Sequence, residues 1–353
     1  MSAAWLAANL EAADPAFVGK IERIEFEAVG SQTTDRSLAR IIFKAGESPP
    51  ALSCFIKSRS LDFATGLFGA VFDLGLTEVR FYQQIRAEVP VRTPQPRFAT
   101  ARSSGGDFVL VLDRLEGRDL NFKTVADSAT LAEAEKVIDA LAALHAHFWQ
   151  DRRFATTLNW LQDSLVERWE IVARPLRKYA FEKVFREHAS LFPHEVSQRR
   201  QLLETVVPAA HRHNHIRPET LLHGDPHLGN MYFQDGEVGL LDWQVVQRGC
   251  GMKDVAYFMI TSLSPELRRA HQYLLLERYV EGLARHGVSG YGFDEAWHDY
   301  RINSIHSFVA IVVTAASGAM QERAVVERGL RNTSSALIDL DAIELFRGLD
   351  ASA

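Results

Sequence analysis

The sequence predicts an α+β protein with two lobes, an antiparallel sheet lobe at the N-terminus and a larger, mostly helical lobe at the C-terminus. The first hundred residues contain short stretches rich in β-branched and aromatic residues, separated by turn sequences. After Gly117, apolar residues recur at helical spacing instead. The length of 353 residues also suits two lobes, because a domain has about 150 residues on average.

The N-terminal part is expected to contain four strands, over residues 21–28, 37–44, 51–57 and 108–112. Turns at GSQTTD and KAGESPP divide the first three. A helix is expected to begin near Thr77 and to end before Pro90, because proline cannot continue a helix.

The C-terminal part is expected to be helical from about residue 130. Apolar positions between Leu131 and Phe148 follow the helical period, and Thr130 with Glu133 forms a capping box at the start. Residues 160–210 and 264–350 also have helical patterns. We therefore expect an N-terminal nucleotide-binding lobe at 1–112, a linker at 113–118, and a C-terminal catalytic and substrate-binding lobe at 119–353.

Composition excludes several classes of protein. Lys plus Arg number 39 and Asp plus Glu 45, so the chain lacks the basic surplus that proteins use to bind nucleic-acid phosphates. Cys54 and Cys250 cannot form a disulfide framework. The N-terminus lacks the basic region of a secretory signal, and the longest uncharged apolar stretch is too short to span a bilayer. We expect a cytoplasmic protein without nucleic-acid partners or a membrane span, and the oligomeric state stays open.

Residues 221–244, with the sequence LLHGDPHLGNMYFQDGEVGLLDWQ, carry the most chemistry. Asp235-Gly236 lies between two short apolar stretches and predicts a two-residue hairpin turn. In that register residue 230 lies opposite residue 241, so Asn230 and Asp242 are expected at the same open end. Amide and carboxylate oxygens are ligands that suit Mg²⁺.

Asp225 lies five residues before Asn230, in a loop stiffened by Pro226, which disfavours a helical conformation at Asp225. The D-x-x-x-x-N spacing equals that of the catalytic loop of protein kinases. There an Asp orients the substrate hydroxyl, while an Asn and a second Asp hold the metal. The segment therefore favours phosphoryl transfer.

The residues HGD-x-x-x-x-N followed by LLDWQ resemble the signature of the aminoglycoside phosphotransferase and choline kinase superfamily, which has a protein-kinase-like fold. RGCGMKDVAYFM at 248–259 and LAALHAHFW at 141–149 resemble its ecdysteroid-kinase-like branch. The resemblance extends from about residue 20 to 285. It implies a kinase that uses Mg²⁺ and moves the γ-phosphate of ATP to a hydroxyl of a small-molecule alcohol.

The resemblance also implies residue roles in the C-terminal part. Asp225 would be the catalytic base and His223 would brace the catalytic loop. Asn230 and Asp242 would ligate Mg²⁺. Asp254 would hold the catalytic loop through hydrogen bonds.

In the N-terminal part, Lys57 ends the third strand and would contact the α- and β-phosphates, paired with Glu78 on the next helix. Glu88 is the rival acid. Because the head group of Lys57 is expected in a cleft, Lys57→Met is expected to leave the melting temperature within a few degrees, since surface-like substitutions usually change stability by no more than about 0.5 kcal/mol. The phosphate loop has one glycine, Gly30, followed by Ser31, where the family has a glycine-rich flap.

Adenine would be read by backbone groups of the linker, at Asp113 and Leu115. The family often has an acidic pair at this place, whereas this chain has Asp113-Arg114.

Two other classes of function stay open. His211, His213 and His215 alternate, so on a strand they would share one face, and with His223 and His227 they suggest a metal-dependent hydrolase. A non-catalytic nucleotide-binding scaffold would normally lack the base or a metal ligand, and both are present here.

The acceptor is expected to be a bulky, partly apolar alcohol. Residues 258–305 hold six acidic residues and five arginines, without the strong acidic surplus that a polycationic acceptor would favour. The same stretch contains seven aromatic residues: Phe258, Tyr273, Tyr279, Tyr291, Phe293, Trp297 and Tyr300.

Overall fold

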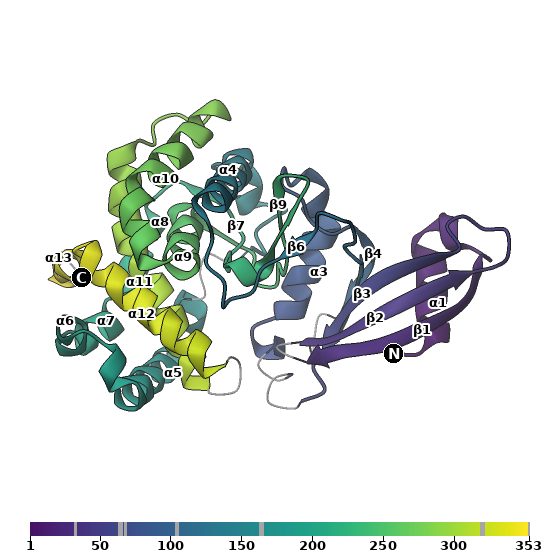
Figure 1. Ribbon diagram of the computed structural model, residues 1–353, viewed down its shortest axis with the longest axis horizontal. Coiled ribbons are helices and arrows are strands. Elements are labelled where there is room, and N and C mark those ends of the chain that lie inside the picture. The colour runs from purple at the N-terminus through teal and green to yellow at the C-terminus, as the bar shows by residue number, and fades with distance from the viewer. Residues whose placement is uncertain are drawn as a thin grey trace. The chain divides into compact units, whose positions relative to one another are not determined.

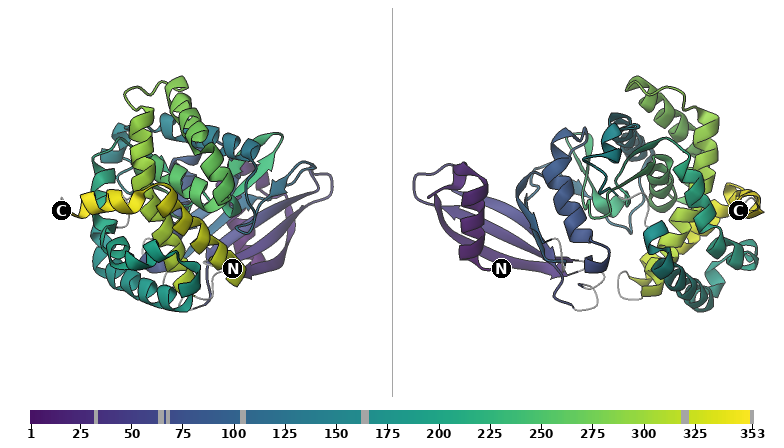
Figure 2. Two further views of the ribbon diagram at one scale, coloured as in Figure 1. Left: turned by 60° about the vertical axis from the view of Figure 1, so that its left-hand side comes forward. Right: turned by 180° about the vertical axis from the view of Figure 1, so that it is seen from behind.

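The structure is a computed structural model that describes residues 1–31, 34–62, 66, 69–102, 106–161, 166–317 and 322–351. The chain divides into two compact units, shown as ribbons in Figures 1 and 2. One comprises Met1–Leu120 with Leu241–Val245, and the other Asn121–Leu240 with Val246–Ala353. The sequence prediction placed residues 241–245 with the C-terminal lobe, whereas their contacts group them with the N-terminal unit.

The N-terminal unit is built on an antiparallel five-stranded sheet with the strand order β1-β2-β3-β5-β4. Its strands are β1 (Ile21–Ser31), β2 (Thr34–Phe43), β3 (Ala51–Arg59), β4 (Pro96–Ala101) and β5 (Phe108–Asp113). The four predicted strands are all present. The sequence did not predict β4. Its six residues are all half-buried, so the strand has no buried face that an alternation of apolar and polar residues would reveal.

Helices cover this sheet at two places: α1 (Ala3–Ala13) with a 3₁₀ turn at Pro15–Phe17, and α3 (Leu74–Gln84) with a 3₁₀ turn at Arg86–Glu88. The helix predicted from Thr77 thus begins three residues earlier, and its last turn before Pro90 is a 3₁₀ turn. Side chains of α1 and of the first 3₁₀ turn join the sheet in one apolar core, comprising Leu6, Leu10, Phe17, Ile24, Ala39, Ile41, Cys54, Ile56 and Val111.

The C-terminal unit is mostly helical, as predicted. Its longer helices are α4 (Leu131–His147), α5 (Val166–Glu187), α8 (Val207–His215), α9 (Met252–Ser262), α10 (Pro265–Arg285), α11 (Phe293–Ser317), α12 (Arg323–Asp339) and α13 (Ala342–Ala351). Shorter elements are α6 (His194–Gln198), α7 (Arg200–Thr205) and 3₁₀ turns at Arg152–Ala155, Ala189–Leu191 and Leu228–Asn230. Its strands are β6 (Asn121–Phe122), β7 (Glu219–Leu222), β8 (Met231–Gln234), β9 (Glu237–Leu240) and β10 (Gln247–Cys250).

Two local features of this unit position the later chemistry. The capping box at α4 is confirmed, because the Glu133 amide donates to Thr130 Oγ1 at 3.3 Å and the Thr130 amide to Glu133 Oε2 at 2.9 Å. Helix α9 is buried along almost its whole length and packs against α11 and α4. It therefore offers a rigid base for the loop that follows β7.

Within the described ranges, no helix has both the length and the apolarity that a bilayer-spanning segment needs. Cys54 and Cys250 are both free thiols and both are buried.

Candidate active site

The hairpin predicted at residues 231–240 is present with the predicted register. Met231 pairs with Leu240, and Gln234 pairs with Glu237. The turn residues Asp235 and Gly236 have φ angles of 53° and 80°, the left-handed values that a two-residue hairpin turn of type I′ requires. Asn230 therefore immediately precedes β8, and Asp242 comes two residues after the end of β9.

The loop between β7 and β8 is hydrogen-bonded to the side chain of Asp254, which lies on α9 and is 1% exposed. Its Oδ2 accepts the amide of His223 at 2.6 Å, and its Oδ1 accepts the amide of Gly224 at 3.0 Å. Gly224 has a φ of 87°, a backbone conformation that glycine adopts without strain. The hydrogen bonds predicted for Asp254 are thus confirmed.

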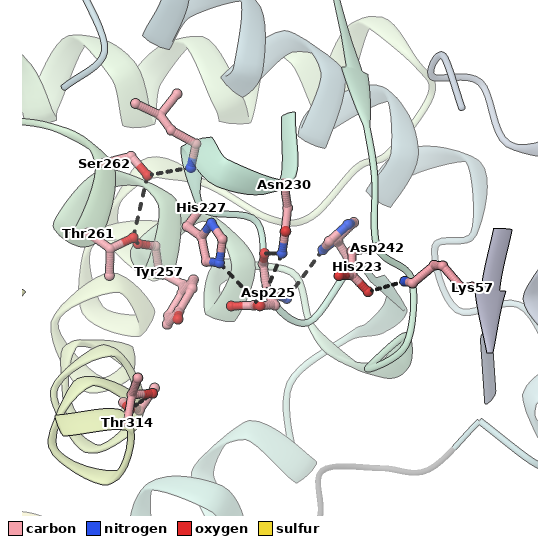
Figure 3. Close-up of polar contacts among 12 residues, drawn as sticks. Lys57, His223, Asp225, His227, Asn230, Asp242, Tyr257, Thr261, Ser262 and Thr314 are labelled. Carbon is pink, nitrogen blue, oxygen red and sulfur yellow. Dashed lines mark hydrogen bonds and ion pairs between the residues drawn. The ribbon is translucent and has the colours of Figure 1, made fainter. Parts of the chain in front are cut away.

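Asp225 follows directly in this loop, and its neighbours are shown in Figure 3. Asn230 donates its amide nitrogen to Asp225 Oδ2 at 3.1 Å and to the Asp225 carbonyl at 3.0 Å. The Asp225 amide donates to His223 Nδ1 at 3.3 Å, and His227 Nε2 lies 3.4 Å from Asp225 Oδ2. The structure therefore brings His223, Asp225 and Asn230 together, and the amide oxygen of Asn230 is used in neither of its bonds to Asp225.

Tyr257, one turn after Asp254 on α9, was not predicted to belong to this site. Burial raises the pKa of its phenol well above the ordinary value, and the charge of Asp225 and a hydrogen bond to that carboxylate act in the same direction. Its ring centroid lies 6.5 Å from that of His227. Residues three apart on a helix lie on the same side, so the predicted contact of Asp254 with the catalytic loop could have indicated Tyr257 as a second residue near that loop.

In the N-terminal unit, Lys57 forms a compact ion-pair cluster with Glu78 and Asp242 (Figure 3 shows the Lys57–Asp242 contact). Lys57 Nζ lies 2.7 Å from Glu78 Oε2 and 2.8 Å from Asp242 Oδ1. Burial alone would lower the pKa of the Lys57 ammonium, but the charges of Asp242 and Glu78 outweigh it and raise the pKa. Glu78, not Glu88, is thus the acid paired with Lys57.

The segment that carries Asp242 is anchored on α3. Trp243 is fully buried and stacks on Phe81, with 4.0 Å between ring centroids and 9° between the ring planes. The Trp243 amide also donates to the carboxylate of Glu78. Asp242 has a φ of 63°, a left-handed conformation that Asp tolerates better than most residues. A strained residue fixed by its neighbours is common where side-chain direction matters.

Gly30 and Ser31, the predicted phosphate-loop residues, are the last two residues of β1, and the following Gln32 and Thr33 lie outside the described residues. Asp113 ends β5, and its carboxylate forms a bidentate pair with Arg97, at 2.6 and 2.7 Å. Leu115 is half-buried in the segment that follows.

The histidine-rich segment does not form the strand on which a shared metal face depends. His211, His213 and His215 lie on α8, where residues two apart point to different sides. His213 Nε2 instead contacts the buried Asp299 at 2.7 Å. In the described part of the chain, no group of three or more His, Cys, Asp or Glu is placed to hold a metal.

Comparison with known proteins agrees with these features. Residues 71–297 match the phosphotransferase enzyme family, so the chain belongs to this family. It is a small-molecule phosphotransferase with an alcohol group as acceptor. The match does not distinguish the ecdysteroid-kinase-like branch from the others.

Three solved structures illustrate the protein-kinase-like fold. A protein from Ralstonia eutropha JMP134, assigned as an aminoglycoside phosphotransferase, is 12% identical, with a TM-score of 0.56 over 96% of this chain and 97% of its own. An amicoumacin kinase in complex with AMP-PNP and Ca²⁺ is 12% identical (TM-score 0.54, 89% of this chain and 87% of its own). A choline kinase from Cryptosporidium parvum is 11% identical (TM-score 0.52, 98% and 95%). No curated protein sequence is similar enough to count as a relative.

Proposed function

We propose that the protein is an ATP-dependent kinase that transfers the γ-phosphate to a hydroxyl of a small-molecule alcohol, with Asp225 as the base. The supporting observation is the Asp225 loop. The backbone amides of His223 and Gly224 donate to the buried Asp254 carboxylate and fix the loop, and Asn230 donates to the Asp225 carboxylate. A carboxylate held in this way can orient a substrate hydroxyl and accept its proton, which is the main protein contribution that phosphoryl transfer requires.

For the nucleotide and metal we propose the predicted residues. Lys57, oriented by Glu78, would contact the phosphates, and Asn230 with Asp242 would bind Mg²⁺. Mg²⁺ is usually bound through one or two protein ligands together with substrate phosphates. The lack of a described cluster of three metal-binding side chains therefore fits Mg²⁺ better than a transition metal. The amicoumacin kinase bound to AMP-PNP and Ca²⁺ supports the use of ATP with a divalent cation.

For the base of the nucleotide we propose backbone recognition in the linker. The amides of Asp113 and Arg114 already donate to the carbonyls of Gln95 and Ser53, at 2.8 and 3.0 Å. The Asp113 carboxylate is bound by Arg97. A backbone amide that donates a hydrogen bond to adenine would therefore have to belong to Leu115 or to a later residue, which agrees with the role proposed for Leu115. For the phosphates, Gly30 and Ser31 stay part of the proposal.

The proposed acceptor remains a bulky, partly apolar alcohol, although fewer aromatic side chains are accessible to it than the sequence suggested. Of the seven aromatic residues counted in the sequence, four are buried in the core: Phe258, Tyr279, Tyr291 and Tyr300. Tyr273 is 52% exposed and stacks on Trp297. Tyr257 lies beside Asp225 but is as buried as these four, at 7% exposed, so Tyr273 and Trp297 remain the aromatic support for an acceptor with an apolar part.

Transfer can be tested by offering a panel of hydroxylated compounds with MgATP and measuring nucleoside diphosphate release. Asp225→Asn keeps the size and hydrogen bonding of the side chain but removes the basic carboxylate. We expect transfer to fall by about two to four orders of magnitude, the usual contribution of a general base, with MgATP affinity little changed. Full transfer in this variant would favour a scaffold that binds nucleotide without Asp225-dependent chemistry.

The metal assignment has its own test in the same assay series. Asp242→Ala should remove the Mg²⁺-dependent part of nucleotide affinity in calorimetric titration, because the carboxylate would reach the phosphates only through the metal. Equal MgATP affinity in Asp242→Ala and the parent would show that Asp242 is not a metal ligand.

A further inference from the structure

Arg36 on β2 lies directly beside the proposed nucleotide lysine. In the sheet register Arg36 pairs with Lys57 on β3 on one side and with Gly30 on β1 on the other. Side chains directly opposite each other on neighbouring strands project from the same face, about 5 Å apart. Two cations in this arrangement destabilise a sheet unless an anion lies between them.

The anion that now lies between them is Asp242. Lys57 bonds both Glu78 and Asp242 below 3 Å, whereas Arg36 Nη2 lies 3.5 Å from Asp242 Oδ2, at the outer limit of a hydrogen bond. The Nε of Arg36 is buried and has no hydrogen-bond partner among the described residues. The guanidinium is therefore held in place but poorly satisfied, and 26% of the side chain is open to solvent.

Such a guanidinium matches a phosphate group. Arginine presents parallel N–H donors that bind phosphate oxygens in pairs, and this binding would satisfy the donors that Asp242 leaves unused. A loop with several glycines can bind phosphate through its backbone amides, but here Gly30, opposite Arg36, is the one glycine of the turn sequence.

We propose that Arg36 is a second phosphate-binding cation of the nucleotide site and compensates for the glycine-poor loop. This inference rests on the proposed function, because it requires Asp242 to exchange its ion pairs for Mg²⁺ when nucleotide binds. With Asp242 engaged by the metal, Arg36 and Lys57 together face the phosphate chain. Without ligand, the charges of the two cations and the two carboxylates of this cluster sum to zero. Mg²⁺ bound at Asp242 would bring the sum to +2, which favours binding of a phosphate chain.

The test compares nucleotides that differ in phosphate number. Calorimetric titrations of AMP, ADP and MgATP would be made with the parent, Arg36→Gln and Arg36→Lys. We expect Arg36→Gln to bind MgATP about ten- to a hundredfold more weakly, as the loss of a charge-assisted contact predicts, while its AMP affinity stays within about twofold. Arg36→Lys should recover part of the MgATP affinity. Arg40→Gln removes the same charge from an exposed position on the same strand and should change none of the affinities.

Three results would overturn the proposal. Unchanged MgATP affinity in Arg36→Gln would remove Arg36 from the site. Tighter MgATP binding would make Arg36 a competitor that blocks Asp242. An equal loss for AMP, ADP and MgATP, together with a lower melting temperature, would make Arg36 a structural partner of Asp242.

Inorganic tripolyphosphate separates this inference from the proposed function. If the parent binds tripolyphosphate and Arg36→Gln does not, the anion site is supported even if no nucleotide binds, and the proposed kinase function alone would fail. If both proteins bind tripolyphosphate equally, Arg36 is not its ligand, whatever the outcome for nucleotides.

Discussion

The two candidate clusters are stabilised in different ways. In the N-terminal unit, Lys57, Glu78 and Asp242 are held by ion pairs between formal charges, all at 2.7–2.8 Å. In the C-terminal unit, Asp225 is held by hydrogen bonds to neutral groups: its backbone amide donates to His223 Nδ1, and its carboxylate accepts from the side-chain amide of Asn230. A region that binds a polyphosphate needs fixed positive charge, whereas a base that accepts a proton needs a fixed direction and an unneutralised carboxylate.

The pKa values of basic groups differ between the two units in a related way. Lys57 is 3% exposed, and its two carboxylate partners raise the pKa of its ammonium and so keep it charged. His211 and His306 in the C-terminal unit have pKa values lowered well below the ordinary value, first by burial and then by the charge of Lys253. Burial alone therefore does not decide the protonation state of these groups, because the sign of the neighbouring charge also acts on it.

The largest expected effect comes from breaking the N-terminal cluster. The sequence predicted a change of no more than about 0.5 kcal/mol for Lys57→Met, on the view that the head group lies in an open cleft. That view was wrong, because Lys57 is 3% and Glu78 1% exposed. Lys57→Met leaves the Glu78 carboxylate buried without its ammonium partner, so we expect unfolding in urea to show a loss of about 3–5 kcal/mol.

A double variant separates lost charge pairing from lost packing. Lys57→Met with Glu78→Leu replaces the pair by apolar side chains and should recover most of the stability, since buried ion pairs are often replaceable in this way. Lys44→Met, at an exposed position after β2, is the matched control and should change stability by less than about 0.5 kcal/mol. A small effect of Lys57→Met alone would mean that the cluster is held mainly by packing.

The second effect concerns the neutral imidazoles of the C-terminal unit. The charged groups that act on His211 are Lys253, Arg177 and His215, and those on His306 are Lys253 and His211, all of them basic. Below about pH 6.5, the ordinary histidine pKa, the unfolded chain takes up protons that the native state does not. The free energy of unfolding should therefore fall as the pH falls, by up to about 1.4 kcal/mol per pH unit for each of the two residues.

Urea unfolding between pH 7 and pH 5 measures this slope. His306→Gln should reduce the slope of the free energy of unfolding against pH by the contribution of one titrating histidine. His286→Gln, which changes an exposed histidine at the end of α10, should leave the slope as in the parent. An unchanged slope in His306→Gln would show that this imidazole is protonated in the native state. The C-terminal unit would then resemble the N-terminal cluster after all.

The features that the sequence predicted well are local ones. The Asp235-Gly236 turn fixes the register of β8 and β9, and Thr130 with Glu133 fixes the start of α4, because each depends on residues a few positions apart. The pairing of Lys57 with Glu78 was also predicted, because the resemblance to the kinase superfamily implies a lysine at the end of the third strand and an acid on the next helix.

The features that the sequence did not predict depend on residues far apart in the chain. The place of Arg36 beside Lys57 depends on the register between β2 and β3, which the connection at residues 44–50 is too long to define as a two-residue turn would. Residues 241–245 group with the N-terminal unit because Trp243 stacks on Phe81, a contact between distant segments. The burial of Lys57 could not be read from a strand end either, because it depends on the partners of the side chain.

The smallest expected effect tests whether the direction of Asp225 depends on a neutral hydrogen bond. Tyr257→Phe removes the phenol that bonds Asp225 but keeps the ring. We expect turnover to fall about five- to tenfold, the equivalent of one net hydrogen bond of about 1 kcal/mol, with KM for MgATP unchanged. The same change made in Asp225→Asn should have no further effect, because the carboxylate that the phenol positions is gone. Tyr291→Phe, which breaks a 2.9 Å bond to the buried Asp299 in the same unit, is the matched control and should lower stability but not turnover. Equal losses of turnover in both tyrosine variants would make Tyr257 a packing residue, and the C-terminal site would then owe the orientation of Asp225 to the Asp254-braced loop and Asn230 alone.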